Sequence, residues 1–200
     1  MTRSRFSRRH LLALGGAAFA GGLAGPAAAQ DFTGDIAGER NLSSEPHRRN
    51  TQSFRTVQWQ DHFDNLRNGA ILCDVASRAL HFWSEDESQY LVYPTSVPMS
   101  EEFTRRGRTE IVLLRRDPIW IPTPGMRERD PSLPERVEAG PENPLGTRAM
   151  NLGWTFYRIH GIDNPAKVGR MASNGCFGLF NHHVEYLFEQ VKIGTQVVVI

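Results

Sequence analysis

Short apolar runs, separated by charged or glycine-containing turns, alternate along the middle of the chain. Four of these runs are rich in β-branched and aromatic residues and predict strands at 70–75, 79–83, 88–94 and 109–115. A further strand is expected at 154–160, where Phe156, Arg158 and His160 fall on one face, and another at 195–200. Together these strands predict a β-rich, mainly antiparallel domain.

A single amphipathic helix is expected before the last of these strands. Its apolar positions recur at i, i+3, i+4 and i+7 and form one stripe, made by Val184, Leu187, Phe188 and Val191. Asn181 is placed to cap the start of this helix, and Gly194 is placed to end it. The predicted fold class is therefore mainly β with one packed C-terminal helix.

Two segments depart from this pattern. Residues 117–146 contain repeated prolines, at Pro118, Pro122, Pro124, Pro131, Pro134, Pro141 and Pro144. Since proline is excluded from central strands and helix interiors, we expect a long ordered loop, here called the lid segment, and loops of this length are often functional. Residues 30–66 are polar and predict a linker or wrapping arm, with a short helical or turn stretch at 56–66 that contacts the domain.

Residues 1–29 have the composition of an export signal. Arg8 and Arg9 precede an apolar, glycine-containing stretch that ends in Ala27-Ala28-Ala29, which resembles a twin-arginine signal peptide cleaved after Ala29. The alternative is an uncleaved membrane anchor, because residues 11–29 are about long enough to span a bilayer. In either case we expect the folded part in the periplasm. If the signal peptide is cleaved, no membrane span remains.

Length and charge limit the remaining possibilities. The 200 residues, 40% of them hydrophobic, suit one globular core, which we place at 67–200. Four of the 23 Lys and Arg residues lie in the first 29 positions, which leaves 19 basic against 22 acidic residues and a net charge of −3. Interspersed charges of this balance are not typical of nucleic-acid binding. The oligomeric state stays open.

The two cysteines have different surroundings. Cys73 lies in an apolar, strand-like run, where a cysteine behaves as a small hydrophobic residue. Cys176 follows Gly175 in a turn-like Ser-Asn-Gly-Cys stretch, where a thiol is accessible. A pair of cysteines in an exported chain also suggests a disulfide, and the sequence leaves open whether these two are joined.

His160 is a candidate base for Cys176. A thiol at its ordinary pKa is mostly protonated at neutral pH and needs a base nearby to act as a nucleophile. His160 ends a predicted strand sixteen positions before Cys176, with a glycine-marked loop between them. Gly175 allows a tight turn, so that the amides of Gly175 and Cys176 can donate to a developing oxyanion. Spacing alone does not distinguish this role from that of a structural histidine.

Further motifs surround the pair. They are GPENPLGTRAM at 140–150, YRIHG at 157–161, Gly169-Arg170, SNGCF at 173–177, Asn181 and VVV at 197–199, with EFT at 102–104 and WIPTP at 120–124 upstream. Together they closely resemble the L,D-transpeptidase catalytic (YkuD-type) domain over about residues 67–200. The resemblance implies a β-sandwich or mixed sheet with one packed helix, in an exported enzyme of the bacterial cell wall.

The resemblance also assigns residues to roles. It makes Cys176 the nucleophile, His160 the general base, Gly175 the turn glycine and Gly161 the residue whose carbonyl orients the imidazole. The residues expected to bind substrate are Ser173, Asn174, Arg158 and Phe177. No metal or organic cofactor is implied, and His182-His183 lacks a third ligand at suitable spacing.

The implied reaction is acyl transfer on peptidoglycan tetrapeptide stems through a cysteine thioester, with a stem amine as acceptor and a 3→3 cross-link as product. Water as acceptor would make the chain an L,D-carboxypeptidase, and a protein amine would make it an enzyme that anchors proteins to peptidoglycan. Carbapenems are expected to acylate the same thiol. The sequence leaves the acceptor open.

Two positions depart from the family pattern. Many members have His or Ser where this chain has Asn174, and an amide can still form a hydrogen bond there. The second departure is the more serious. Two residues after the cysteine the family usually carries an arginine, and this chain has Gly178. Losing a guanidinium beside the thiolate is expected to raise the thiol pKa. Our hypothesis is that Arg158 or Arg170 partly replaces the missing charge. A non-catalytic peptidoglycan-binding module that kept the fold is the alternative.

Overall fold

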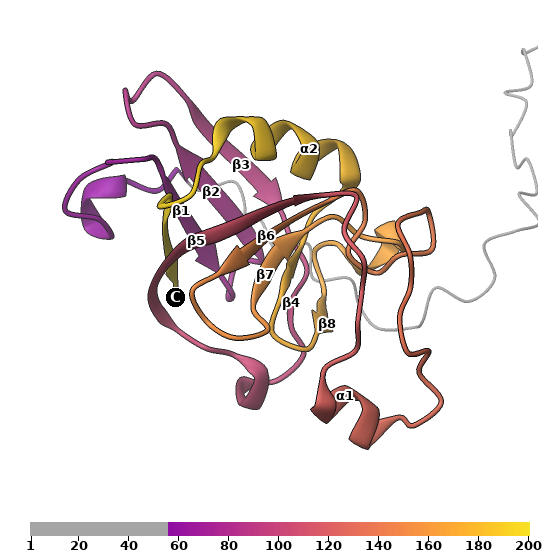
Figure 1. The fold of residues 1–200 in the computed structure, drawn as a ribbon. Helices are drawn as coiled ribbons and strands as arrows, with labels where there is room; N and C mark the ends of the chain where they lie inside the picture. Colours follow the sequence, from indigo (N-terminus) through magenta and orange to yellow (C-terminus); the bar gives the residue numbers. More distant parts are fainter. Residues whose placement is uncertain (1–55) are drawn as a thin grey trace, which may run out of the picture. The chain divides into compact units, whose positions relative to one another are not determined.

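The computed structural model describes residues 56–200 (Figure 1). The expected signal peptide at 1–29 and most of the arm at 30–66 lie outside these residues. Within 56–200, no helix combines the length and the apolar character needed to cross a bilayer.

Most of the strands belong to one curled, mixed sheet (Figure 1). The strands are β1 (Ala70–Asp74), β2 (Ala79–Trp83), β3 (Tyr90–Pro94), β4 (Val97–Pro98), β5 (Gly107–Arg116), β6 (Arg148–Leu152), β7 (Arg158–His160), β8 (Met171–Ser173), β9 (Phe177–Gly178) and β10 (Gln196–Val199). Eight strands form the sheet in the order β3-β2-β1-β10-β5-β6-β7-β9, while β4 and β8 pair separately. The β1–β10 and β7–β9 pairs are parallel, and the other pairs of the large sheet are antiparallel.

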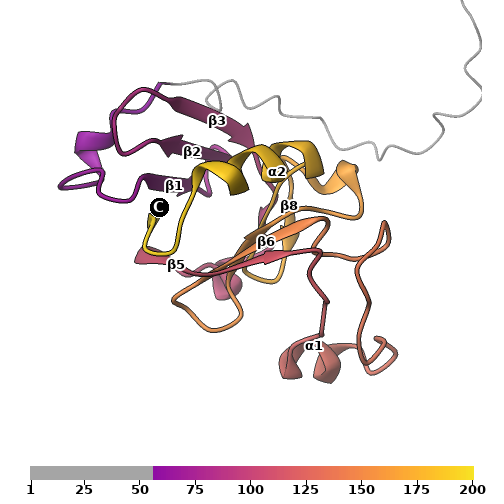
Figure 2. The same cartoon turned by 45° about the horizontal axis from the view of Figure 1, so that its top comes forward.

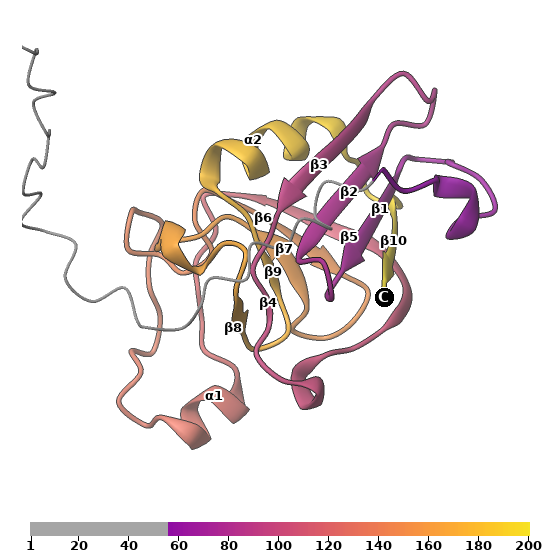
Figure 3. The same cartoon turned by 180° about the vertical axis from the view of Figure 1, so that it is seen from behind.

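The helices are few and mostly short. They are α1 (Pro124–Arg129), α2 (Asn181–Gln190) and the 3₁₀ turns η2 (Trp59–Asp61), η3 (Glu101–Phe103) and η4 (Pro165–Lys167). Figures 2 and 3 show α2 lying along β3 and β6, whereas α1, in the first half of the lid segment, lies away from α2. The fold class is the predicted one, mainly β with one packed helix.

The long strand β5 joins the two halves of the sheet. Its first part pairs with β10 and its second part with β6, and the register shifts between Ile111 and Leu113. Beyond this bulge, Arg115 pairs with Ala149, Ala149 with His160, and His160 with Gly178. Since directly paired residues share a face of a sheet, this row lies on one face of β5-β6-β7-β9.

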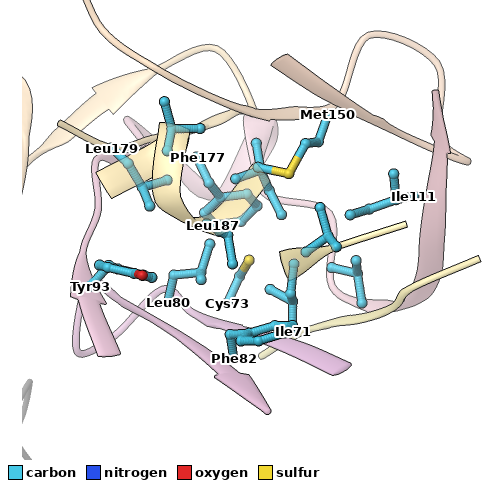
Figure 4. Close-up of a cluster of buried hydrophobic side chains, with 14 of the residues drawn as sticks. Ile71, Cys73, Leu80, Phe82, Tyr93, Ile111, Met150, Phe177, Leu179 and Leu187 are labelled. Atoms are coloured by element: carbon cyan, nitrogen blue, oxygen red, sulfur yellow. The ribbon is translucent and has the colours of Figure 1, made fainter. Parts of the chain in front are cut away.

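The hydrophobic core lies on the opposite face of these strands. Met150 and Phe177 point from β6 and β9 toward Ile71 and Phe82 of β1 and β2, with Leu187 of α2 between them (Figure 4). All five side chains are buried. The core therefore lies between the two halves of the sheet and α2. The row that contains His160 is on the other face, outside this core, where it can meet the lid segment and loops.

Residues 56–66 pack on the far side of β1 and β2. Phe63 and Leu66 are buried there against Trp83 and Val198, and Val57 lies beside them. The predicted contact of this stretch with the domain is confirmed, and η2 supplies its single turn.

The structure confirms the predicted strands near 70–75, 79–83, 88–94, 109–115 and 195–200, and it corrects three local predictions. Residues 154–157 form a turn rather than strand, because Tyr157 donates back to the Trp154 carbonyl and Phe156 has a φ of 71°. The strand β6 was not predicted, and the lid segment contains α1, which starts at Pro124 after a Thr123 cap.

Candidate active site

His160 presents a neutral imidazole to a cavity at the end of β7. Its Nδ1 lies against the carbonyl of Gly161, and because a carbonyl only accepts, Nδ1 carries the proton and Nε2 is left with its lone pair. The side chain is buried, and this burial lowers the pKa of His160 from 6.5 to about 4. At neutral pH the ring is therefore uncharged and able to accept a proton.

Asn181 holds the turn that orients this imidazole. Its Oδ1 accepts from the amides of Ile162 (3.1 Å) and Thr147 (3.3 Å), and its Nδ2 donates to the Ile162 carbonyl (3.1 Å). A Cβ on Gly161 would lie 2.2 Å from Oδ1, so only glycine fits the turn. The expected helix-capping role of Asn181 was wrong: the N-cap is Phe180, with no side-chain cap.

Cys176 lies in the tight loop between β8 and β9. The Ser173 hydroxyl donates to the Cys176 carbonyl (2.6 Å) and lies 3.4 Å from the Gly175 amide, so one side chain closes the loop. Gly175 has a φ of 119°, and a Cβ there would lie 3.0 Å from the Tyr157 ring. The thiol is half-buried and its Sγ contacts the Phe156 carbonyl at 3.4 Å.

Two opposing effects set the pKa of the Cys176 thiol. Burial is the larger one and raises the pKa. Arg158 acts against it through its charge and through hydrogen bonds from its backbone and side chain. Because burial also lowers the pKa of His160, the two side chains rest as a neutral thiol, with the proton on sulfur, and a neutral imidazole.

The two side chains line one cavity of about 140 Å³. Its walls come from the loops around the pair and from the lid segment, and include Ser96, Trp120, Ile121, Thr123, Met126, Leu145, Phe156, Arg158, Ser173 and Asn174. Three of the residues expected to bind substrate, Arg158, Ser173 and Asn174, are thus on the cavity wall. Phe177 is not: it is 1% exposed and packs in the core, because its place on β9 directs it to the face opposite His160.

The lid segment contacts the cysteine loop directly. Arg129, the last residue of α1, donates to Asn174 Oδ1 (2.6 Å) and its guanidinium lies 4.8 Å from the centre of the Phe103 ring. The Tyr157 hydroxyl, in turn, donates to the Phe103 carbonyl (3.0 Å). These contacts join the lid segment to the loop that carries Cys176. The proline content of the lid segment alone did not predict this connection.

Donors for an oxyanion are present beside the thiol. The Cys176 amide donates to no residue in the part of the chain that the structure describes, and the Gly175 amide has only the long contact with Ser173. Free amides at a turn can stabilise negative charge that develops on a bound carbonyl oxygen.

Gly178 stands where a side chain has no room. A Cβ there would lie 2.6 Å from Ser96 Oγ and 3.0 Å from Ile162 Cδ1. The strand is fixed in this position, since Ser96 and Gly178 exchange backbone hydrogen bonds of 2.8 and 3.3 Å. Of the two arginines expected to replace the missing charge, Arg158 lines the cavity, whereas Arg170 is exposed outside it.

Both cysteines of the chain are free thiols in the structure. Cys73 is fully buried in the core, and burial raises its pKa far above the ordinary range, as expected for a structural cysteine. Within residues 56–200 there is no group of three or more His, Cys, Asp or Glu side chains that could hold a metal. His183 instead packs against the rings of Tyr93 and Phe180.

Comparison with solved structures supports the fold. An L,D-transpeptidase from Mycobacterium smegmatis matches with a TM-score of 0.52 at 18% identity, over 66% of this chain and 58% of that one. L,D-transpeptidase 3 from Mycobacterium tuberculosis, in complex with a faropenem-derived adduct, matches with a TM-score of 0.51 at 18% identity, over 66% and 60%. The chain therefore spans less than two thirds of these structures.

Sequence comparisons extend over more of the chain. A protein of Fuscovulum blasticum, from ORF 5 of an ATP synthase subunits region and assigned to the L,D-transpeptidases, is 42% identical over 97% of both chains. ErfK/SrfK of Escherichia coli strain K12, with the same assignment, is 35% identical over 68% of this chain but only 45% of its own length. The model of the L,D-transpeptidase catalytic domain, YkuD, matches residues 68–199, which contain both His160 and Cys176. This chain belongs to the L,D-transpeptidase catalytic domain family.

Proposed function

We propose that the protein is a cysteine L,D-transpeptidase that acts on the tetrapeptide stems of peptidoglycan and forms 3→3 cross-links. The observation that carries this proposal is that Cys176 and the neutral imidazole of His160 line one cavity, with backbone amides next to the thiol. The solved structure with a faropenem-derived adduct supports covalent chemistry in a protein of the same fold.

The first half-reaction transfers an acyl group to sulfur. As Cys176 Sγ attacks the carbonyl of the third, diamino-acid residue, its proton passes to Nε2 of His160. The amides of Gly175 and Cys176 donate to the oxygen that becomes negative. When the tetrahedral intermediate collapses, the imidazolium returns the proton to the leaving nitrogen, and the terminal D-alanine departs from the thioester.

The second half-reaction reverses these roles. The side-chain amine of a neighbouring stem attacks the thioester, His160 takes a proton from that amine, and the proton returns to sulfur as the new amide forms. Water in place of the amine would release a free acid, and a protein amine would attach that protein to the stem.

Arg158 supplies the positive charge that Gly178 lacks. It lowers the pKa of the Cys176 thiol, whereas Arg170 is exposed and outside the cavity wall. The test is the rate of Cys176 alkylation measured against pH. Arg158→Gln is expected to move the thiol pKa upward, and Arg170→Gln is the matched control with no shift. An unchanged profile in both variants would remove Arg158 from this role.

Export to the periplasm belongs to the same proposal. It rests on the twin arginines and the Ala-x-Ala stretch of residues 1–29, and on a substrate that lies outside the cytoplasm. Fractionation of cells that carry the full chain, compared with an Arg8→Lys/Arg9→Lys variant, tests it. We expect a shortened protein in the periplasmic fraction for the native chain only, and equal export of both would contradict the twin-arginine route.

The decisive experiment for the enzymatic function is mass spectrometry of the protein without residues 1–29 after incubation with disaccharide tetrapeptide. We expect an acyl adduct on Cys176, release of D-alanine and a cross-linked dimer. Cys176→Ala should give none of these, while Cys73→Ala should give all three. Stem binding without adduct or product would instead support a non-catalytic binding module, and release of D-alanine without a dimer would support a carboxypeptidase.

A further inference from the structure

A second cavity adjoins the active site on the same face of the sheet. It has a volume of about 240 Å³ and shares Ile121, Leu145 and Arg158 with the first cavity. Its remaining wall is formed by Arg115, Ile119 and Arg136. Three arginines thus surround a space that continues from the cavity containing Cys176.

The strand register explains why Arg115 faces this space. Arg115 is in the same row as Ala149 and His160, whereas its neighbour Arg116 points to the other face and pairs with Glu189 of α2 (2.8 Å). Two strand spacings separate the backbones of Arg115 and His160, or about 10 Å. Ala149 stands between them in this row with only a methyl group, and the wall that the two cavities share is formed by Ile121, Leu145 and Arg158.

The charge in this second cavity is largely uncompensated. The Arg115 guanidinium makes no hydrogen bond or ion pair with any of residues 56–200, and Arg136 has one exposed partner, Glu138, at 2.6 Å. Arg158 faces the Cys176 thiol from the boundary between the two cavities. A cavity lined by three arginines and by the apolar side chains of Ile119, Ile121 and Leu145 suits an anionic group of a ligand.

We propose that this second cavity is a carboxylate subsite, which binds a free carboxylate on the acyl part of the peptide substrate, the part that becomes attached to Cys176, and selects stems in which that carboxylate is not amidated. The inference rests on the proposed function for the identity of the substrate. An extended peptide advances about 3.3 Å per residue, so a carboxylate one to three residues from the attacked carbonyl reaches the span of about 10 Å. Guanidinium groups bind carboxylates through paired hydrogen bonds that a neutral carboxamide does not reproduce.

The acyl part of a stem offers two such carboxylates, that of the second residue and, where the third residue is a diamino diacid, its distal one. The experiment therefore uses three synthetic tetrapeptide stems: one with both carboxylates free, and two in which one or the other is a carboxamide. For the native protein we expect kcat/KM to be about tenfold or more higher for the free stem than for one of the two amidated stems. The stem that is disfavoured identifies which carboxylate the subsite binds.

The variants are Arg115→Gln, Arg136→Gln and the pair combined, which leave Arg158 and its contact with Cys176 in place. The combined variant should lose the preference by weakening turnover of the free stem, with little change for the disfavoured amidated stem. Arg108→Gln is the matched control, because Arg108 lies on the same strand outside both cavities, and it should keep the native preference.

Binding of the three stems to Cys176→Ala separates failure of this inference from failure of the proposed function. If the native protein turns over no stem, the proposed function fails, and the binding preference of Cys176→Ala still decides the subsite. Equal kcat/KM and equal binding for all three stems would overturn the carboxylate subsite. A preference that survives in the combined variant would overturn its location.

Discussion

Adding a single methyl group at Gly178 tests how the active-site face is packed. The Cβ of Gly178→Ala would lie 2.6 Å from Ser96 Oγ, 3.0 Å from Ile162 Cδ1 and 3.8 Å from His160 Cε1. The backbone of Gly178 does not have a positive φ, so the cost comes from space rather than from backbone strain. The first two contacts are shorter than normal van der Waals separations, and at least one neighbour must move.

The expected loss of stability follows from overpacking. Extra methyl groups in a well-packed region typically cost about 1–3 kcal/mol, and the 2.6 Å contact places Gly178→Ala toward the upper end of this range. The Ser96 hydroxyl also accepts from the Gly178 amide (3.0 Å), so rotating it away would sacrifice a buried hydrogen bond worth about 1 kcal/mol. An arginine at this position should cost more.

A double-mutant cycle identifies the clash. Ser96→Ala removes the hydroxyl oxygen and keeps the Cβ, so Gly178→Ala should cost about 1–2 kcal/mol less in that background than in the native chain. Urea unfolding measures the free energy, and acylation of Cys176 measures whether His160 has moved. Additive effects of the two substitutions would refute the assignment of the clash to Ser96 Oγ.

Three further predictions concern the surroundings of the pair. The unfolded imidazole takes up a proton below pH 6.5, whereas buried His160 does so only near its pKa of about 4, so the folded state should lose up to about 3 kcal/mol of stability as the pH falls between these values. Urea titrations at pH 7 and 4.5 measure this loss, which His160→Gln should lack. Equal losses in both proteins would contradict the buried neutral imidazole. Asn181→Ala leaves the amides of Ile162 and Thr147 without their acceptor, and we expect the free energy of unfolding to fall by about 2–4 kcal/mol and acylation of Cys176 to slow. A change in stability below about 1 kcal/mol would show that the turn does not depend on this side chain. In the native protein an alkylating agent should label Cys176 and spare the fully buried Cys73 until urea is added, and peptide mass spectrometry measures both. Rapid labelling of Cys73 in the native protein would contradict its burial.

Much of the fold was predictable because strand periodicity and turn residues are local signals. The strands at 70–74 and 79–83 and the apolar stripe of α2 were expected from sequence. The strand β6 was missed, since its pattern follows directly on a proline-rich segment and carries Arg148 and Asn151 between apolar residues. Residues 154–157 satisfied the alternation of a strand, but the positive φ of Phe156 ends that pattern in a turn, which no single-residue preference indicates.

The active-site pair could be named from motif and resemblance, whereas its supporting contacts could not. Asn181 acts through hydrogen bonds to residues 19 and 34 positions away, and Arg129 meets Asn174 across 45 positions. Such long-range contacts leave no periodic signal. Phe177 was expected to bind substrate, but strand alternation directs it into the core.

The neutral state of the resting pair has a consequence for the lifetime of the protein. Oxidation to sulfenic and higher acids proceeds through the thiolate, so a thiol whose pKa is raised by burial is a poor target for peroxide. In the proposed mechanism, Cys176 becomes strongly nucleophilic only when a bound carbonyl lets His160 withdraw the proton as the new bond forms. A half-buried sulfur with this behaviour would resist peroxide better than a permanently ionised cysteine, at the cost of a slower attack on each substrate.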